Sequence, residues 1–215
     1  MAELYGYHDL ITAADRRSVL IAGYYGHRNL GDESILGIMV EELRRASPQL
    51  DVTVVSSSPA ETKATHGVNT VHERDVPAIL EVARGCDLII VGGGGLFHDY
   101  QGVQEPTLLT RWHWGLTYYA AFPLIATLFR KRLFVAAAGV GPLQSDVGRR
   151  YTRLVFERAD AATVRDVASR EVLAGLGVDT GRVEVTADPA WMLHVPDRAE
   201  GLARLARLGA LSSSD

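Results

Sequence analysis

The sequence predicts an α/β domain with a doubly wound, mostly parallel, Rossmann-like sheet. Three observations predict this fold class. Short apolar runs such as 18–23 (SVLIAG) lack polar alternation, which is typical of strands buried on both faces. Longer stretches with apolar residues at helical spacing separate these runs. The strand–helix–strand repetition favours right-handed crossovers between parallel strands.

The expected elements follow one another along the chain. Strands are predicted at 18–23, 52–57, 87–95, 133–141, 161–164 and 183–187, and helices at 32–46, 76–85, 108–132, 147–158 and 167–176. Gly85 is expected to stand just past the end of its helix, a position that glycine favours. The apolar stretch 115–129 is shorter than the roughly 20 residues of a membrane span. It therefore predicts a buried helix with a basic last turn at 130–132, and a helix lying on a membrane surface is the alternative.

Composition limits the classes of function. The chain has 215 residues, of which 47% are hydrophobic and 22% charged, as in ordinary globular domains. Its net charge of −4 offers no basic surface for nucleic acid. The single cysteine excludes an internal disulfide and fits a reducing compartment. No CxxC or HExxH spacing occurs, so no bound metal is predicted. No bound cofactor is expected either, and the oligomeric state stays open.

Residues that could bind or react with a ligand cluster at the carboxyl ends of the predicted strands. Ligands of open α/β sheets bind at this edge. The opposite edge receives ordinary helix ends, and this asymmetry predicts a ligand site. The candidates are Gly26, Asn29, Gly31 and Asp32 after the first strand, Gly92, Gly93, Gly94, Gly95, His98 and Asp99 at the third, Gly139 and Gly141 at the fourth, Arg165 and Asp166 after the fifth, and Asp188 after the sixth.

Two nucleotide-binding motifs are disfavoured by spacing. Gly26 and Gly31 have the spacing of a phosphate-binding P-loop, but Asp32 and Glu33 stand where that loop needs Lys and Ser or Thr. The fingerprint G-x-G-x-x-G does not follow the first strand, and no acidic residue ends the second. The chain is therefore not a P-loop kinase, and NAD binding is not expected.

Structural roles remain open for several candidates. Asn29 or Asp32 is expected to cap the helix at 32–46. The glycine run 92–95 is either a tight turn or a place where a ligand approaches the backbone. The turn at 139–142 opens a helix whose N-terminus suits an anion. The other open alternatives are a cap with a salt bridge for Arg165 and Asp166, and surface loop positions for His98 and Asp99.

Five motifs, in order, resemble those of the polysaccharide pyruvyl transferase family. They are GYYGHRNLGDESIL, CDLIIVGGGGLFHD, AAAGVGPLQS, ATVRDVASREVLAGLGV and VTADPAW, within residues 18–195. The resemblance implies transfer of a pyruvyl group from phosphoenolpyruvate to a sugar, forming a ketal. The implied acceptor belongs to a cell-surface polysaccharide or its lipid-linked precursor. The implied location is the cytoplasm, with peripheral association at the inner face of the membrane as the alternative.

The resemblance also implies half of a two-domain, GT-B-like architecture with the site between the domains. Residues 1–195 are expected to form the N-terminal Rossmann-like domain. Residues 196–215 are expected to be a truncated helix or linker that leads to a second domain absent from this sequence.

The implied reaction suggests roles for the candidates. Asp32 is expected to bind sugar hydroxyls or to accept a hydroxyl proton. His98, oriented by Asp99, is expected to protonate the methylene carbon of the donor. The turn from Gly26 to Gly31 is expected to present backbone N–H groups. The donor is expected to bind Arg28, Arg165, His98 and the amides of 92–95.

Two other functions stay open. A glycosyltransferase with a GT-B-like fold would use a nucleotide sugar at the same edge of the sheet. A non-catalytic domain would bind glycan or a partner protein, through an exposed apolar surface in the second case.

Overall fold

The computed structural model describes residues 17–100, 102–103, 105–113, 115–194 and 197–207. Within them, seven parallel strands form one sheet in the order β3-β2-β1-β4-β5-β6-β7. The predicted doubly wound fold is confirmed, and the direction of winding reverses between β1 and β4. The strands are β1 (Ser18–Ala22), β2 (Asp51–Ser56), β3 (Asn69–His72), β4 (Leu88–Phe97), β5 (Arg132–Val140), β6 (Ala161–Val164) and β7 (Val183–Val185).

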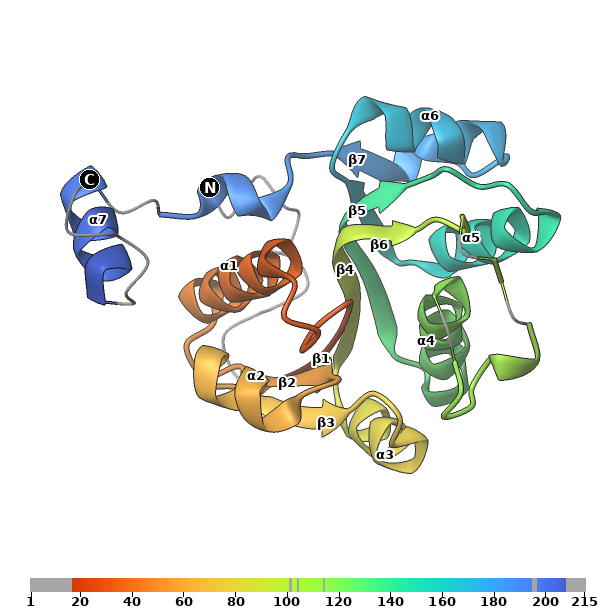
Figure 1. The fold of residues 1–215 in the computed structure, drawn as a ribbon. Coiled ribbons are helices and arrows are strands. Elements are labelled where there is room, and N and C mark those ends of the chain that lie inside the picture. The colour runs from red at the N-terminus through yellow and green to blue at the C-terminus, as the bar shows by residue number, and fades with distance from the viewer. Residues whose placement is uncertain (1–16, 101, 104, 114, 195–196, 208–215) are drawn as a thin grey trace.

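Helices cover both faces of the sheet, as right-handed crossovers on either side of the reversal require. α1 (Leu30–Ala46) and α2 (Pro59–His66) lie on one face (Figure 1). The other face carries α3 (Val76–Gly85), α4 (Leu116–Phe129), α5 (Asp146–Arg158) and α6 (Val167–Gly175). An apolar cluster fills each interface, one around α1 and one around α4 and α5. The last described helix, α7 (Arg198–Arg207), buries none of its residues.

Local sequence rules place the N-terminus of α1 at the carboxyl end of β1. The apolar residues that recur at helical spacing between 35 and 43 are buried against the sheet. Asn29 is the N-cap, and its side-chain oxygen accepts hydrogen bonds from the N–H groups of Gly31 and Asp32 at 3.0 and 3.4 Å. Asn29, rather than Asp32, therefore caps the helix.

The apolar region between 108 and 132 differs from the prediction. Its helix, α4, spans only Leu116–Phe129, and a 3-10 turn at Glu105–Thr107 precedes it. The helix begins after Gly115, whose φ of +52° is unfavourable for other residues. Arg130 ends it in a left-handed conformation and Arg132 already belongs to β5, so these residues do not form a basic last helical turn. Most of the helix is buried, as predicted.

No helix in the described part of the chain combines the length and the apolar character that crossing a bilayer needs.

Two elements of the fold, α2 and β3, are not predicted from the sequence. α2 is polar, with Thr62 as its buried residue, and β3 is an edge strand of 4 residues. Each gives little apolar signal, although Pro59 at the start of α2 and Gly67 at its end mark the helix.

The glycine run 92–95 is not a tight turn. It continues β4, where Gly92 pairs with Ala136 and Gly94 with Ala138. Gly93 and Gly94 have φ values of +88° and +86°. A Cβ atom on Gly93 would lie 2.6 Å from Ile35 Cγ2 of α1. These glycines therefore let α1 pack closely against the strand, and the approaching group is the protein's own helix rather than a ligand.

Gly93→Ala is expected to lower the free energy of unfolding by about 2–4 kcal/mol, because it combines an unfavourable φ with overpacking against Ile35. Gly85→Ala is the matched control. Gly85 is the last residue of α3, not the residue after it, and a Cβ there meets nothing within 4 Å. The control is expected to be neutral or to stabilise by up to about 1 kcal/mol. Urea denaturation measures both variants, and equal effects would contradict the packing explanation.

Candidate active site

A cleft of about 700 Å³ opens at the carboxyl ends of β1 and β4, where the winding of the sheet reverses. It includes four predicted site residues, Asn29, Asp32, Gly95 and His98. The structure therefore brings together residues that are far apart in the sequence. The full described lining is Gly23, Tyr24, His27, Asn29, Asp32, Glu73, Arg74, Gly95, Leu96, His98, Tyr100, His113, Gly115, Tyr118 and Tyr119.

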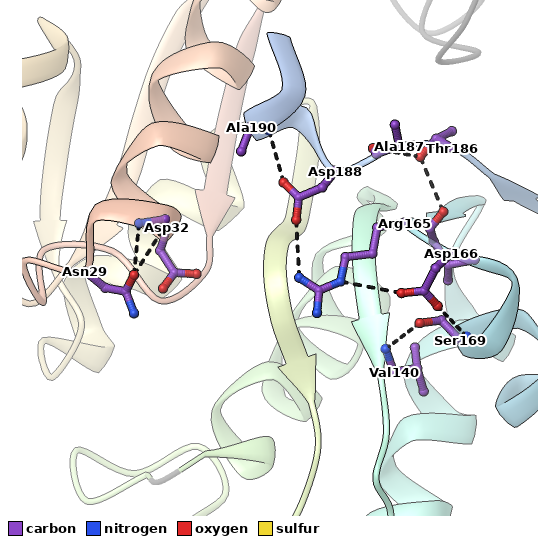
Figure 2. Close-up of polar contacts among 12 residues, drawn as sticks. Asn29, Asp32, Val140, Arg165, Asp166, Ser169, Thr186, Ala187, Asp188 and Ala190 are labelled. Atoms are coloured by element: carbon purple, nitrogen blue, oxygen red, sulfur yellow. Dashed lines mark hydrogen bonds and ion pairs between the residues drawn. The ribbon is translucent and has the colours of Figure 1, made fainter. Parts of the chain in front are cut away.

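Asp32 is the central carboxylate of this cleft. Figure 2 shows its side chain beside the capped first turn of α1, with no interaction drawn to the carboxylate. Among the described residues, no hydrogen bond or ion pair reaches that carboxylate. Burial raises the pKa of Asp32 from 3.8 to about 6, and the charges of Glu33 and Asp188 add to this effect, whereas His27 and Arg165 oppose it. A group with this pKa can accept and return a proton near neutral pH.

The turn before α1 is predicted to present backbone N–H groups, but those of its two glycines, Gly26 and Gly31, already donate to side chains of the protein itself. The N–H of Gly26 donates to Glu33 Oε1 at 2.7 Å, and Asn29 holds those of the first helical turn. Glu33 Oε2 also lies 3.4 Å from His66 Nε2 of α2. Glu33, which belongs to α1, thus contacts both the glycine loop and α2. The second carboxylate of the Asp32–Glu33 pair has a structural role that excludes it from the cleft chemistry.

Both arginines predicted to bind the donor are paired with carboxylates. Arg165 Nη1 lies 3.2 Å from Asp188 Oδ2, and its Nε lies 3.7 Å from Asp166 Oδ2, as Figure 2 shows. Arg28 Nε lies 3.2 Å from Glu61 Oε2 of α2, and its side chain is 81% exposed. Neither arginine lines the cleft. Each guanidinium therefore already has a carboxylate partner, and binding of the donor by these arginines stays a prediction.

The two carboxylates beside Arg165 also cap helices. Asp166 accepts a hydrogen bond from the N–H of Ser169 at 2.7 Å, and hydrogen bonding from Ser169 holds the pKa of Asp166 below its ordinary value. Asp188 accepts one from the N–H of Ala190 at 3.0 Å. Asp166 therefore caps a helix and pairs with Arg165, which is the structural alternative left open by the sequence. Asp188 also caps a helix and pairs with Arg165.

Gly139 and Gly141 lie outside the cleft lining. A Cβ atom on Gly139 would lie 2.7 Å from Arg165 Nε, so this glycine makes room for the guanidinium. Gly141 donates its N–H to the carbonyl of Phe97 at 2.7 Å and precedes a cis peptide bond to Pro142. Both glycines shape the ends of β4 and β5 rather than contact the cleft.

The sequence predicts that Asp99 orients His98, but in the structure the Asp99 carboxylate binds other partners. Its carboxylate accepts hydrogen bonds from the N–H groups of Gln144 and Ser145, at 2.6 and 2.8 Å, and from the Ser145 hydroxyl. Burial raises the pKa of Asp99, but the hydrogen bonds from Ser145 and Gln144 outweigh burial and hold this pKa below its ordinary value. The N–H groups that lead into α5 are predicted to suit an external anion. They donate instead to the protein's own carboxylate at Asp99.

His98 lines the cleft without a carboxylate partner. Its ring stacks on Tyr100 with the ring centroids 4.0 Å apart. Its Nδ1 atom is buried and has no hydrogen-bond partner among the described residues. Burial lowers the pKa of His98, and the charge of Asp99 offsets this only in part. Burial therefore favours the neutral imidazole of His98, which disfavours its predicted role as a general acid.

Sequence reasoning missed a histidine–carboxylate pair in the cleft. The ring of His27 stacks on Tyr24 with the centroids 4.0 Å apart, and its Nε2 lies 3.2 Å from Glu73 Oε2. Glu73 is 46 residues from His27 in the chain. It directly follows β3, so recognition of that short strand would have placed Glu73 at the ligand-binding edge.

The raised pKa of Asp32 predicts a stability cost near neutral pH. The folded pKa of about 6 lies above the ordinary 3.8, so the contribution of this group to stability is fully present below 3.8 and is lost as the pH rises through 6. Asp32→Asn is expected to raise the free energy of unfolding by about 1–2 kcal/mol at about pH 8, allowing for partial exposure. The gain is expected to shrink towards zero as the pH falls to about 4.

Glu81→Gln, on the exposed side of α3, is the control for this experiment. It is expected to change the free energy of unfolding by less than about 0.5 kcal/mol at either pH. Urea denaturation at the two pH values gives both numbers. A gain for Asp32→Asn that is the same at high and low pH would show that burial of the charge is not its cause.

Comparisons with known proteins indicate the family to which the chain belongs. The family model described as "Polysaccharide pyruvyl transferase" matches residues 29–212. The amylovoran biosynthesis protein AmsJ of Erwinia amylovora is 23% identical over 217 aligned residues, which cover 82% of this chain and 49% of AmsJ.

Solved structures share the fold. Anabaena Alr3699/HepE in complex with UDP superposes with a TM-score of 0.58 at 13% identity, over 89% of this chain and 50% of HepE. A putative UDP-N-acetylglucosamine 2-epimerase from Listeria monocytogenes gives 0.52 at 16% identity, over 89% of this chain and 51% of the epimerase. The chain thus spans about half the length of these relatives. Because the family model covers most of its residues, the chain belongs to the polysaccharide pyruvyl transferase family.

Proposed function

We propose that the chain takes part in transferring the pyruvyl group of phosphoenolpyruvate to two hydroxyl groups of a sugar, as a cyclic ketal. The acceptor is a sugar of a cell-surface polysaccharide or of its lipid-linked precursor. Family membership supports a role in polysaccharide modification. The observation that carries the proposal is the partly buried Asp32 carboxylate, with a pKa of about 6, in a cleft lined by aromatic rings and imidazoles.

Asp32 is suited to act as the base for the first sugar hydroxyl. A hydroxyl group holds its proton too tightly at neutral pH to lose it before it attacks. A base in the cleft therefore takes this proton as the new C–O bond forms. Asp32 has no competing hydrogen bond among the described residues, so its carboxylate is available to a hydroxyl group.

The walls of the cleft suit a neutral polyol. Tyr24 and Tyr100 each stack one ring face on a histidine, but they remain 43% and 56% exposed, so their exposed surfaces can pack on a sugar ring. The carboxylates of Asp32 and Glu73 accept hydrogen bonds and cannot donate them when ionised. Sugar hydroxyls supply the matching donors, which a phosphate dianion lacks.

The donor carries a phosphate and a carboxylate, and both need cationic partners. Among the described lining residues, Arg74 is the only guanidinium. Its side chain is 58% exposed, with Nε 3.9 Å from Glu73 Oε1. We propose that Arg74 binds one anionic group of the donor. Because the chain spans about half the length of its relatives, we propose that a second domain supplies further cations.

A second candidate is glycosyl transfer from a nucleotide sugar. HepE, which shares the fold, has been solved in complexes with UDP and with UDP-glucose. A third is glycan or partner binding without catalysis. A cytoplasmic location, with peripheral contact to a membrane that carries a lipid-linked acceptor, belongs to the first proposal.

The test measures inorganic phosphate released from phosphoenolpyruvate in the presence of candidate glycans. It uses the 215-residue chain and the longest reading frame that contains it. Asp32→Asn is expected to lower kcat at least about 100-fold, and the wild-type kcat/KM is expected to rise with pH through about 6. Asp146→Asn, whose side chain is 96% exposed outside the cleft lining, is the matched control and should keep normal turnover.

Thermal shifts separate the candidates, since a ligand that binds the folded state raises the melting temperature by an amount that grows with the ratio of its concentration to its Kd. Phosphoenolpyruvate is expected to raise it and UDP-glucose to leave it unchanged. Stabilisation by UDP-glucose alone, with no phosphate released from phosphoenolpyruvate, would replace the first candidate by the second.

A further inference from the structure

The pair formed by His27 and Glu73 is built more rigidly than a surface ion pair. Glu73 is anchored at three points. Its backbone N–H donates to the carbonyl of Ser56 at 3.0 Å, its carbonyl lies 3.0 Å from His113 Nε2, and its carboxylate lies 3.2 Å from His27 Nε2. Its side chain is only 14% exposed. Glu73 therefore holds a fixed position at the wall of the cleft.

This geometry sets the tautomer of His27. An ionised carboxylate only accepts hydrogen bonds, so the Nε2 atom that faces Glu73 carries a proton. Nδ1 is then the nitrogen whose lone pair is free of Glu73. The stacked ring of Tyr24, at an interplanar angle of 9°, restrains the orientation of the imidazole. A base oriented by a third group in this way is the usual arrangement of an acid–base catalyst.

His27 also stands beside the proposed base. Both His27 and Asp32 line the cleft, and the charge of His27 lowers the pKa of Asp32, which places the two groups within electrostatic reach of each other. The charged and titratable groups around His27 are Tyr24 on its own loop, Asp32 on α1, and Glu73 and Arg74 after β3.

We propose that His27, oriented by Glu73, carries protons during pyruvyl transfer, first as an acid towards the methylene carbon of the donor and then as a base towards the second sugar hydroxyl. The assignment rests on the proposed function. It replaces His98, which lacks a carboxylate partner among the described residues and whose neutral form is favoured by burial. One group that alternates between acid and base has a precedent in retaining glycosidases.

The protons and bonds balance over two steps. In the first, Nδ1 of the imidazolium gives its proton to the methylene carbon, which becomes a methyl group. The oxygen of the first hydroxyl bonds to C2, and its proton passes to Asp32. In the second, the bond from C2 to the phosphate oxygen breaks, and phosphate leaves with the electron pair. The second hydroxyl oxygen bonds to C2, its proton returns to His27, and the proton on Asp32 leaves with phosphate.

The experiment compares kcat for phosphate release among four variants of the chain that shows turnover. His27→Gln is expected to lower kcat at least about 100-fold, and Glu73→Gln about 10-fold. The double variant is expected to be no slower than His27→Gln alone, because the two residues act as one unit. His194→Gln, an exposed histidine outside the cleft lining, is the control and is expected to keep kcat within about twofold. Melting temperatures check that each variant is folded.

A second measurement does not depend on turnover. The ¹⁵N NMR shifts of the neutral His27 ring are expected to show the proton on Nε2 in the wild type and a mixture of tautomers in Glu73→Gln. A folded His27→Gln variant with kcat within about threefold of the wild type would overturn the proposal. So would a wild-type His27 with its neutral proton on Nδ1. A wild-type protein that never releases phosphate would overturn the proposed function itself, and the proton steps with it.

Discussion

The bare backbone of β4 at Gly93 and Gly94 is the constraint on which the candidate site depends. Helix α1 packs so closely here that a Cβ atom on Gly94 would lie 2.5 Å from Asp32 Oδ1. Tyr25 fills the space beneath, and its hydroxyl donates to the carbonyl of Gly92. The same close approach partly shields Asp32 from water. The packing of α1 against the sheet therefore contributes to the burial that raises the pKa of this carboxylate.

Asp32 keeps its unusual state because neighbouring residues perform the ordinary duties of a helix N-terminus. An acidic residue in the first turn usually caps the helix and is stabilised as an anion by the helix dipole. Here Asn29 caps the turn, and Glu33 binds the loop backbone. Burial outweighs the dipole, so the carboxylate holds its proton up to a pH of about 6. The local fold thus keeps a destabilising carboxylate, that of Asp32, at the position where the proposed reaction needs a base.

The sequence was sufficient to predict the fold because its buried strands and amphipathic helices carry strong periodic signals. It also placed Asp32, Gly95 and His98 at the correct edge of the sheet. The failures concern elements and pairings with weak or distant signals. β3 is only 4 residues long, so Glu73 went unnoticed. Asp99 and Gln144 are 45 residues apart, and only the folded chain shows that this carboxylate binds a helix rather than a histidine. A sequence indicates which residues reach an edge, but not which partners they meet there.

Charge pairing then determines what the cleft can bind. Arg28 and Arg165 pair with carboxylates and are absent from the described lining, where the single guanidinium beside Asp32 and Glu73 is that of Arg74. Such a lining attracts the hydroxyl groups of a neutral sugar more than it attracts an anion. In the proposed reaction, His27 gives up its proton in the first step and regains one from the second sugar hydroxyl as the phosphate leaves, while Asp32 loses its proton to the phosphate. The carboxylates of Asp32 and Glu73 then both face a doubly negative product, so we expect their repulsion to favour departure of the phosphate.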